Sequence, residues 1–248
     1  MKQNIGQNIV KKQIRYDLEI ISRLIAPASK ILDIGCGDGE LLEFLKKYKK
    51  ADARGIEISQ PLVTESIKKG ISVIQGDGES DLEFYPDHSF DYAILSQTIQ
   101  ATKNPKQILQ EMLRIAHCAI ISLPNFTHYK NRWHIVFKGT MPVNKNLPFA
   151  WHDTPNIHFC SIRDFENLCD ELGFKIKQKI FITAKHKLSN FFNFSILPNL
   201  FAEYGIFLIT NNQNSLTAEE DFIFSNKIKQ KINLGSFSGI PVTQNKSS

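Results

Sequence analysis

Hydrophobic positions along this chain alternate between two periods. Short apolar runs typical of buried strands recur between segments in which apolar residues return every three or four positions, as on one face of a helix. The predicted strands span 30–34, 52–57, 71–75, 90–95, 117–123, 174–183 and 202–210. The predicted helices span 8–26, 39–49, 60–68, 104–116 and a segment that begins after Ser161 and ends at Gly173. This alternation predicts an α/β fold with a seven-stranded, mostly parallel sheet and helices on both faces.

Two of the predicted helices have clear start signals. Asn104 is a good N-cap residue, and Pro105 after it suits the first helical position. Ser161 is followed three positions later by Asp164, a spacing similar to that of a capping box. Both signals stand directly before an apolar helical pattern, so they support the predicted boundaries.

The first predicted strand runs directly into a glycine-rich turn, which reads Gly-Cys-Gly-Asp-Gly at 35–39. Glycine lets the backbone turn sharply and lets a ligand approach without meeting a Cβ atom, so the turn predicts a cofactor loop. Asp33, Asp38 and Glu40 surround it, which favours a cationic ligand over a pyrophosphate. S-adenosylmethionine (SAM) carries a sulfonium and an ammonium group, and Asp33 is expected to receive the ammonium.

Two later carboxylates stand where a nucleoside would need them. Glu57 ends the second predicted strand, 20 positions after Gly37, the spacing at which a carboxylate binds a ribose in nucleotide folds. Asp77 follows the third strand, where an acceptor can meet the adenine amino group. The alternative is that both are solvated loop carboxylates. The set resembles the SAM site of class I methyltransferases, which implies a Rossmann-like class I methyltransferase fold.

The predicted cofactor site draws on the ends of four strands and the loops that follow them. Its residues, expected to bind SAM or S-adenosylhomocysteine, are Asp33, Gly35, Cys36, Gly37, Gly39, Glu57, Ile58, Asp77, Gly78, Ser96 and Gln97. Cys36 is expected to serve as a small residue within the turn. The last two follow the fourth strand closely enough to touch the donor.

The methyl acceptor is less clearly marked, and no catalytic residue is predicted. Transfer from a sulfonium is an in-line displacement that depends mainly on alignment and exclusion of water. The loop after the fourth strand has neither the Asn-Pro-Pro-Tyr run typical of nucleobase amine methylation nor a cysteine nucleophile, which argues against a nucleobase acceptor. Gln100 in this loop either faces a substrate or begins a polar helix.

Residues 124–160, after the fifth strand, form a long segment rich in aromatic residues and histidines. Segments of this kind are usually lids or binding surfaces. The candidates for contact with a substrate or partner are Gln100, Asn125, His128, Asp153 and His158. Hydrogen bonding within the segment is the alternative for the histidines, and Phe126 and Trp151 are expected to pack. The histidine spacing predicts no metal site.

Four pieces of the sequence resemble the MetW family of methionine-biosynthesis proteins. They are the glycine turn with the residues after it, Ser-Gln-Thr-Ile-Gln at 96–100, Pro-Asn-Phe at 124–126 and Asp-Thr-Pro-Asn-Ile-His at 153–158. The resemblance runs from about Tyr16 to Thr210. It implies a protein associated with homoserine O-acyltransferase in the acyl-homoserine route to methionine. An active SAM-dependent methyltransferase acting on an unidentified small molecule is the alternative.

Composition and charge bear on which partners and which cellular location are expected. The chain has 248 residues, 42% of them hydrophobic, and a net charge of +5. Its lysines are scattered, and the densest run, Lys46–Lys50, is expected to be a solvated helix end, so nucleic-acid binding is not expected. No apolar run suits a bilayer span or a signal peptide, and the four cysteines lack C-x-x-C spacing, so a cytoplasmic protein with free thiols is expected.

The expected organisation has three parts. Residues 1–28 form an N-terminal helical extension that covers the cofactor pocket, and 29–210 form the SAM-binding domain, with 124–160 as its lid or insertion. Residues 211–248 form a polar tail, at least partly disordered, with one possible short helix over 217–232. The apolar stretch 191–201 is expected to pack over the edge of the domain's own sheet, with a partner surface as the alternative.

Overall fold

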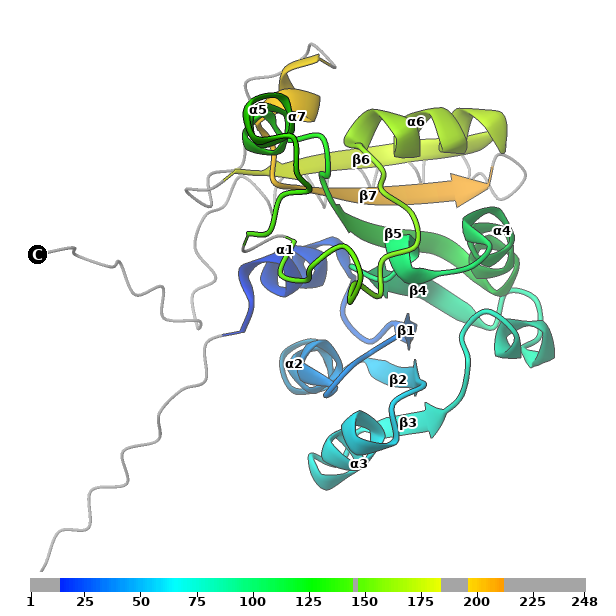
Figure 1. Ribbon diagram of the computed structural model, residues 1–248. Helices are drawn as coiled ribbons and strands as arrows, with labels where there is room; N and C mark the ends of the chain where they lie inside the picture. Colours follow the sequence, from blue (N-terminus) through cyan, green and yellow to red (C-terminus); the bar gives the residue numbers. More distant parts are fainter. Residues whose placement is uncertain (1–13, 145–146, 184–195, 212–248) are drawn as a thin grey trace, which may run out of the picture.

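The computed structural model describes residues 14–144, 147–183 and 196–211, and Figure 1 shows their arrangement. The strands are β1 (Lys30–Ile34), β2 (Asp52–Glu57), β3 (Ser72–Gln75), β4 (Phe90–Ser96), β5 (Ala116–Pro124), β6 (Phe174–Ile182) and β7 (Tyr204–Asn211). The helices are α1 (Tyr16–Leu24), α2 (Glu40–Lys49), α3 (Gln60–Lys68), α4 (Pro105–Ile115), α5 (Tyr129–Lys138), α6 (Ile162–Glu171) and α7 (Ile196–Phe201). Two 3₁₀ turns, η1 (Asp81–Phe84) and η2 (Ile99–Ala101), complete the described elements.

The strands form one sheet in the order β3-β2-β1-β4-β5-β7-β6. The first five are parallel to one another, and β7 lies antiparallel between β5 and β6. The predicted seven-stranded, mostly parallel sheet is therefore confirmed. The chain reverses its direction of winding between β1 and β4, which are neighbours. Ligands of such sheets bind outside the carboxyl ends of the strands at this point.

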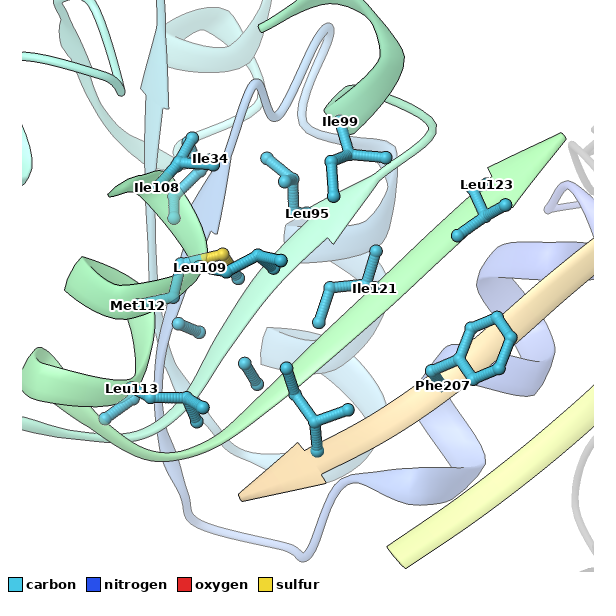
Figure 2. Close-up of a cluster of buried hydrophobic side chains, with 14 of the residues drawn as sticks. Ile34, Leu95, Ile99, Ile108, Leu109, Met112, Leu113, Ile121, Leu123 and Phe207 are labelled. Carbon is cyan, nitrogen blue, oxygen red and sulfur yellow. The ribbon is translucent and has the colours of Figure 1, made fainter. Parts of the chain in front are cut away.

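Each face of the sheet has its own apolar core. On one face, α1 and α2 pack over β1, β4 and the later strands, with Ile21 and Leu42 fully buried. On the other face, α4 and α6 cover β4, β5 and β7. Figure 2 shows Leu109 and Met112 of α4 lying over Leu95 of β4. Helices on both faces were predicted, and both layers hold the strand ends in place beneath the candidate site.

The two predicted helix starts are confirmed. The Asn104 side chain accepts a hydrogen bond from the Gln107 N–H (3.2 Å), and Pro105 is the first residue of α4. Ser161 and Asp164 form a reciprocal capping box at the start of α6. Each cap satisfies backbone N–H groups that the helix leaves free at its start.

Several predictions about the helices need correction. The first helix starts at Tyr16, because Ile14 and Arg15 are not helical; the earlier part of the predicted range lies outside the described residues. The lid segment contains a helix that was not predicted, α5, which ends at Gly139. Lys49 is buried rather than solvated, since its Nζ donates to the Ile25 carbonyl at 3.1 Å.

Several predicted features lie outside the described residues. They are the start of the N-terminal extension, the phenylalanines at 191–194, the possible helix over 217–232 and the tail. None of the helices in the described ranges combines the length and the apolarity that a membrane crossing needs.

Candidate functional site

The glycine turn after β1 is held from two sides. Gly35, Gly37 and Gly39 all have positive φ angles (70°, 59° and 75°), which only glycine adopts without strain. The Gly35 N–H donates to the Ile56 carbonyl of β2 at 2.8 Å. From α3, the Ser66 hydroxyl donates to the Gly37 carbonyl at 3.2 Å. The turn is therefore fixed against the neighbouring strand and helix before any ligand binds.

The space around the three glycines is unequal. A Cβ atom at Gly39 would lie 2.8 Å from the Ser66 hydroxyl, and one at Gly35 would lie 3.0 Å from the Thr98 hydroxyl. A Cβ atom at Gly37 would meet nothing within 4 Å. Gly37 therefore marks the open side of the turn, where a ligand can approach the backbone.

Glu57, at the end of β2, binds the backbone of this turn. Its Oε2 accepts a hydrogen bond from the Gly37 N–H at 2.8 Å, and its Oε1 accepts one from the Ser59 N–H at 2.9 Å. The residue is 7% exposed. A carboxylate has about four acceptor positions, so both oxygens retain capacity for ribose hydroxyl groups.

Asp33 of β1 is the most unusual group of the site. It is 3% exposed, and its Oδ1 has no hydrogen-bond partner. Burial raises its pKa to about 7, the nearby charge of Glu57 adds to this shift, and the positive charge of Arg15 opposes it. A buried carboxylate oxygen without a donor is costly, and a cationic ligand would supply the missing donor. This atom fits the ammonium group of SAM.

Asp77 and Gly78 follow β3 in a compact turn. The Asp77 N–H donates to Asp81 Oδ2 at 3.0 Å, and Asp77 Oδ1 accepts from the Glu79 N–H, also at 3.0 Å. A Cβ atom at Gly78 would lie 2.3 Å from Ile34 Cγ2, so the turn packs against the end of β1. The turn thus holds Asp77 beside the β1 end of the predicted site.

The turn after β4 is anchored to β5 and to α1. Gln97 has a φ of 53°, and its N–H donates to the Ser122 carbonyl at 2.9 Å. Ser96 and Ser122 join their hydroxyl groups at 3.1 Å. The Gln97 side chain donates to Asp17 Oδ2 at 2.7 Å, which ties this turn to the first helix.

Arg15 and Asp17 belong to the same region and were not predicted as site residues. The Arg15 guanidinium binds the Asp17 carboxylate through Nη2 at 2.6 Å and Nε at 3.1 Å. The positive charge of Arg15 also opposes the rise in the pKa of Asp33. Neither residue belongs to a recognisable motif, and only the folded chain brings Asp17 to the turn after β4.

The side chain of Asn125 forms its hydrogen bonds within the protein. Its Nδ2 donates to the Asn199 and Ala202 carbonyls, both at 2.8 Å. Its Oδ1 accepts from the Thr127 N–H at 3.1 Å and from the Thr127 hydroxyl at 2.9 Å. Both amide hydrogens are therefore occupied in joining the end of β5 to α7, which leaves no donor for a ligand.

His128 is the N-cap of α5 and is also buried. Its Nδ1 accepts a hydrogen bond from the Lys130 N–H at 3.3 Å. Burial lowers its pKa, and the charge of Lys130 adds to this, while Glu203 and a hydrogen bond to the Phe201 backbone oppose it. His128 therefore favours the neutral form.

A pocket of about 270 Å³ opens beside His128. Its polar lining comes from Lys130, Asn131, His134 and Glu203, together with His128 itself and Asn144, and Pro142 and Val143 supply apolar surface. Glu203 precedes β7, whose start is paired with the end of β5, so the pocket lies at the carboxyl edge of β5. None of the residues predicted to bind the cofactor lines it.

The two pieces of sequence around Gln100 and His158 meet in the structure. The Gln100 carbonyl accepts hydrogen bonds from the N–H groups of Ile157 (2.8 Å) and His158 (2.9 Å). The Gln100 side chain is buried, and its Nε2 donates to the Gln97 carbonyl at 2.7 Å. The segment before α6 is thus fastened to the turn after β4.

The aromatic residues in the segment 124–160 differ in burial and packing. Phe126 is buried and packs edge-on against Phe159, with ring centres 4.9 Å apart, which confirms its predicted packing role. Trp151 was predicted to pack, but it is 74% exposed, and its ring lies edge-on to that of the neighbouring His152, with centres 5.4 Å apart. Asp153 is exposed and pairs with the same histidine at 3.2 Å.

Comparison with known proteins identifies relatives by sequence. The family model described as methionine biosynthesis protein MetW matches residues 15–209. A curated relative from Rhodopirellula baltica, the bifunctional methionine biosynthesis protein MetXA/MetW, is 35% identical over 177 residues. That match covers 68% of this chain and 28% of the relative, so the chain spans only about a quarter of the length of this curated protein.

Solved structures with low sequence identity share the fold. A SAM-dependent methyltransferase from Mesorhizobium loti is 16% identical with a TM-score of 0.56, over 77% of this chain and 95% of the other. A SAM-dependent methyltransferase from Thermotoga maritima, described as a possible histamine N-methyltransferase, is 19% identical with a TM-score of 0.53, over 79% of this chain and 91% of the other. The chain therefore has the Rossmann-like fold of class I methyltransferases.

Proposed function

Because this chain belongs to the MetW family of methionine-biosynthesis proteins, we propose that it binds SAM and supports the homoserine O-acyltransferase of the acyl-homoserine route to methionine. The observation that carries the SAM part of the proposal is the buried Asp33 carboxylate, whose Oδ1 lacks a donor at the point where β1 enters the glycine turn. A cation in that position would satisfy the atom and offset the burial of its charge.

The rest of the cofactor would lie along the strand ends. Asp33 would take the ammonium group, the open backbone at Gly37 would allow close approach, and Glu57 would hold the ribose. Asp77 would stand beside the adenine, with Gly78, Ile58, Ser96 and Gln97 around it. SAM supplies an electrophilic methyl group on a sulfonium. The residues of this chain would bind it, orient it and exclude water.

The acyltransferase part of the proposal is supported by family membership and by the relative whose name joins MetXA and MetW in one protein. Two functions carried by one polypeptide are held at high effective concentration. Where the two functions lie on separate chains, the chains would need to bind each other to reach the same proximity. SAM is made from methionine, so a SAM-binding partner could report the supply of the pathway's product.

Two measurements test this proposal in sequence. Calorimetric titration with SAM is expected to show binding to the wild-type chain and a loss of at least tenfold in affinity in Asp33→Asn. Turnover of the host's homoserine O-acyltransferase is then measured with and without this chain, each with and without SAM. Stimulation by the chain is expected. Absence of SAM binding would remove the first half of the proposal, and absence of stimulation the second.

The pocket beside His128 favours a second candidate function, methylation of a small molecule. Its volume suits a metabolite, and it carries both a cation, Lys130, and a carboxylate, Glu203. The test is incubation with methyl-labelled SAM and a metabolite extract, followed by a search for labelled product. Label transfer that is lost in Glu203→Gln would support the enzyme, and no transfer by the wild-type chain would exclude it.

A further inference from the structure

The outer face of α5 and the chain after it display an unusual amount of apolar surface. Ten of the sixteen large hydrophobic side chains exposed in the described part of the chain lie between residues 133 and 159. They include Val136 and Trp151, each 74% exposed, and Phe137, 69% exposed. Contiguous apolar patches on a folded protein mark interaction sites, whereas single exposed apolar residues do not. We call the described residues 129–144 and 147–159 the α5 surface.

Helix α5 buries a polar residue and exposes apolar ones, which is the reverse of an ordinary amphipathic helix. Its buried residue is polar: Asn131 donates to the Phe126 carbonyl at 3.0 Å and accepts from Asn144 Nδ2 at 2.9 Å. Its apolar rings point away from the core, and Trp133 and Phe137 stack on each other with centres 4.7 Å apart. Polar contacts fasten the helix to the domain and leave its hydrophobic face without a partner in the described part of the chain.

The α5 surface lies at the carboxyl edge of β5 and is connected to the turn after β4. In Figure 1, α5 sits beside α7 at the end of the sheet, and Tyr129 and Phe201 bring their rings to 5.5 Å. Its far end is hydrogen-bonded through Ile157 and His158 to the Gln100 carbonyl, and from there through Gln97 to α1. A partner bound here would contact chain that is continuous with the turn after β4.

The charge of this segment indicates the chemistry of the partner. Residues 124–160 contain four lysines and arginines and only one acidic residue, Asp153. Protein interfaces combine an apolar centre, often with Trp and other aromatic residues, with a polar rim of complementary charge. The matching surface is therefore a protein surface with an apolar centre and an acidic rim.

We propose that the α5 surface is the docking site for the homoserine O-acyltransferase. This inference rests on the proposed function, which supplies the partner, and adds the surface by which it binds. Trp133 and Phe137 would form the centre of the contact, and Lys130, Arg132 and Lys138 its charged rim. The relative whose name joins MetXA and MetW in one protein supports a contact between these two proteins, for which a dedicated surface is expected.

The test compares two double variants with matched exposure. Trp133→Ser/Phe137→Ser removes the stacked rings from the α5 surface. Ile67→Ser/Phe84→Ser removes two side chains, 57% and 77% exposed, from α3 and η1. Thermal unfolding and SAM titration check that both variants retain the fold. Binding of each to the host acyltransferase is measured by calorimetry at low and at high salt.

The expected result is that the first variant binds the acyltransferase at least tenfold more weakly than wild type, while the second stays within twofold. High salt should weaken the wild-type complex, since the rim is charged. Equal binding by wild type and Trp133→Ser/Phe137→Ser would overturn the docking site but leave the proposed function intact. No binding by the wild-type chain would overturn both.

The same variants distinguish the acyltransferase from two alternative occupants of the α5 surface. Co-sedimentation with vesicles of phosphatidylglycerol and phosphatidylcholine tests a lipid surface, and light scattering after size exclusion tests a second copy of the chain. Vesicle binding or dimer formation that is lost in Trp133→Ser/Phe137→Ser, with acyltransferase binding unchanged, would overturn the proposal in favour of that occupant.

Discussion

The carboxylate of Glu57 accepts a hydrogen bond from the backbone N–H of Gly37 at 2.8 Å, across 20 positions of sequence. The contact joins the end of β2 to the open side of the glycine turn. One carboxylate therefore shapes the loop and, in the proposed function, also faces the ribose. This double role means that changes at either residue should affect the fold and SAM binding to different extents.

Replacing Glu57 by Gln is expected to lower the free energy of unfolding by about 1–3 kcal/mol, because one of the two backbone N–H groups loses its acceptor. SAM affinity is expected to fall at least tenfold. Glu79→Gln is the matched control, since Glu79 also accepts from two backbone N–H groups, those of Lys103 and Asn104, each at 2.8 Å. Chemical denaturation and calorimetry measure the two effects. An equal loss of SAM affinity in both variants would contradict the ribose role of Glu57.

Replacing Gly37 by Ala is expected to abolish measurable SAM binding, because the new methyl group enters the open space at the turn. The left-handed backbone adds a strain of about 1–2 kcal/mol. Gly70→Ala is the control: Gly70 also has a positive φ, 73°, and open space around it, but it lies at the end of α3. Both variants should lose similar stability in thermal unfolding. Loss of SAM binding in Gly70→Ala as well would show that strain, and not contact, is responsible.

The buried Asp33 should make stability depend on pH. Its pKa is about 7 in the folded protein against an ordinary value of 3.8, so the folded chain retains a proton that the unfolded chain has lost between these values. The stabilising contribution is complete below about pH 4 and is lost as the pH rises to 7. Asp33→Asn should therefore raise the melting temperature relative to wild type, more at pH 8 than at pH 5. A difference that does not change with pH would contradict this.

The same carboxylate should make SAM binding depend on pH in the opposite direction. A cationic ligand prefers ionised Asp33, so wild-type affinity should rise between pH 6 and 7 and a proton should be released on binding. Calorimetry in two buffers with different ionisation enthalpies detects the released proton. Asp33→Asn should show weak binding without this rise. A wild-type affinity that stays constant over the range would indicate that Asp33 is not the ammonium acceptor.

Asn125 is expected to act on stability and not on ligand binding. Asn125→Ala leaves the Asn199 and Ala202 carbonyls without their donor, which should cost about 1–3 kcal/mol of unfolding free energy. SAM affinity and binding to the acyltransferase, measured on folded protein at 10 °C, should remain within twofold of wild type. A selective loss of either affinity, with stability unchanged, would indicate that Asn125 does contact a ligand or partner.

Much of the fold and of the glycine turn was accessible from the sequence, because their signals are local. The alternation of apolar periods predicted all seven strands, and the caps at Asn104 and Ser161 were read correctly from neighbouring residues. The glycine turn and Glu57 could be paired from their spacing alone. Helix α5 was missed, since its outward apolar residues do not produce the pattern of a helix packed on a core.

The sequence by itself therefore determined the order of the strands along the chain and the residues that surround the glycine turn. The tertiary structure decided what those residues do. It buried Asp33 without a donor, brought Arg15 and Asp17 to the site, and turned Trp133 outward. These outcomes depend on contacts between segments far apart in the chain. A local sequence pattern does not show which distant groups will hydrogen-bond to a side chain, place a charge near it or bury it.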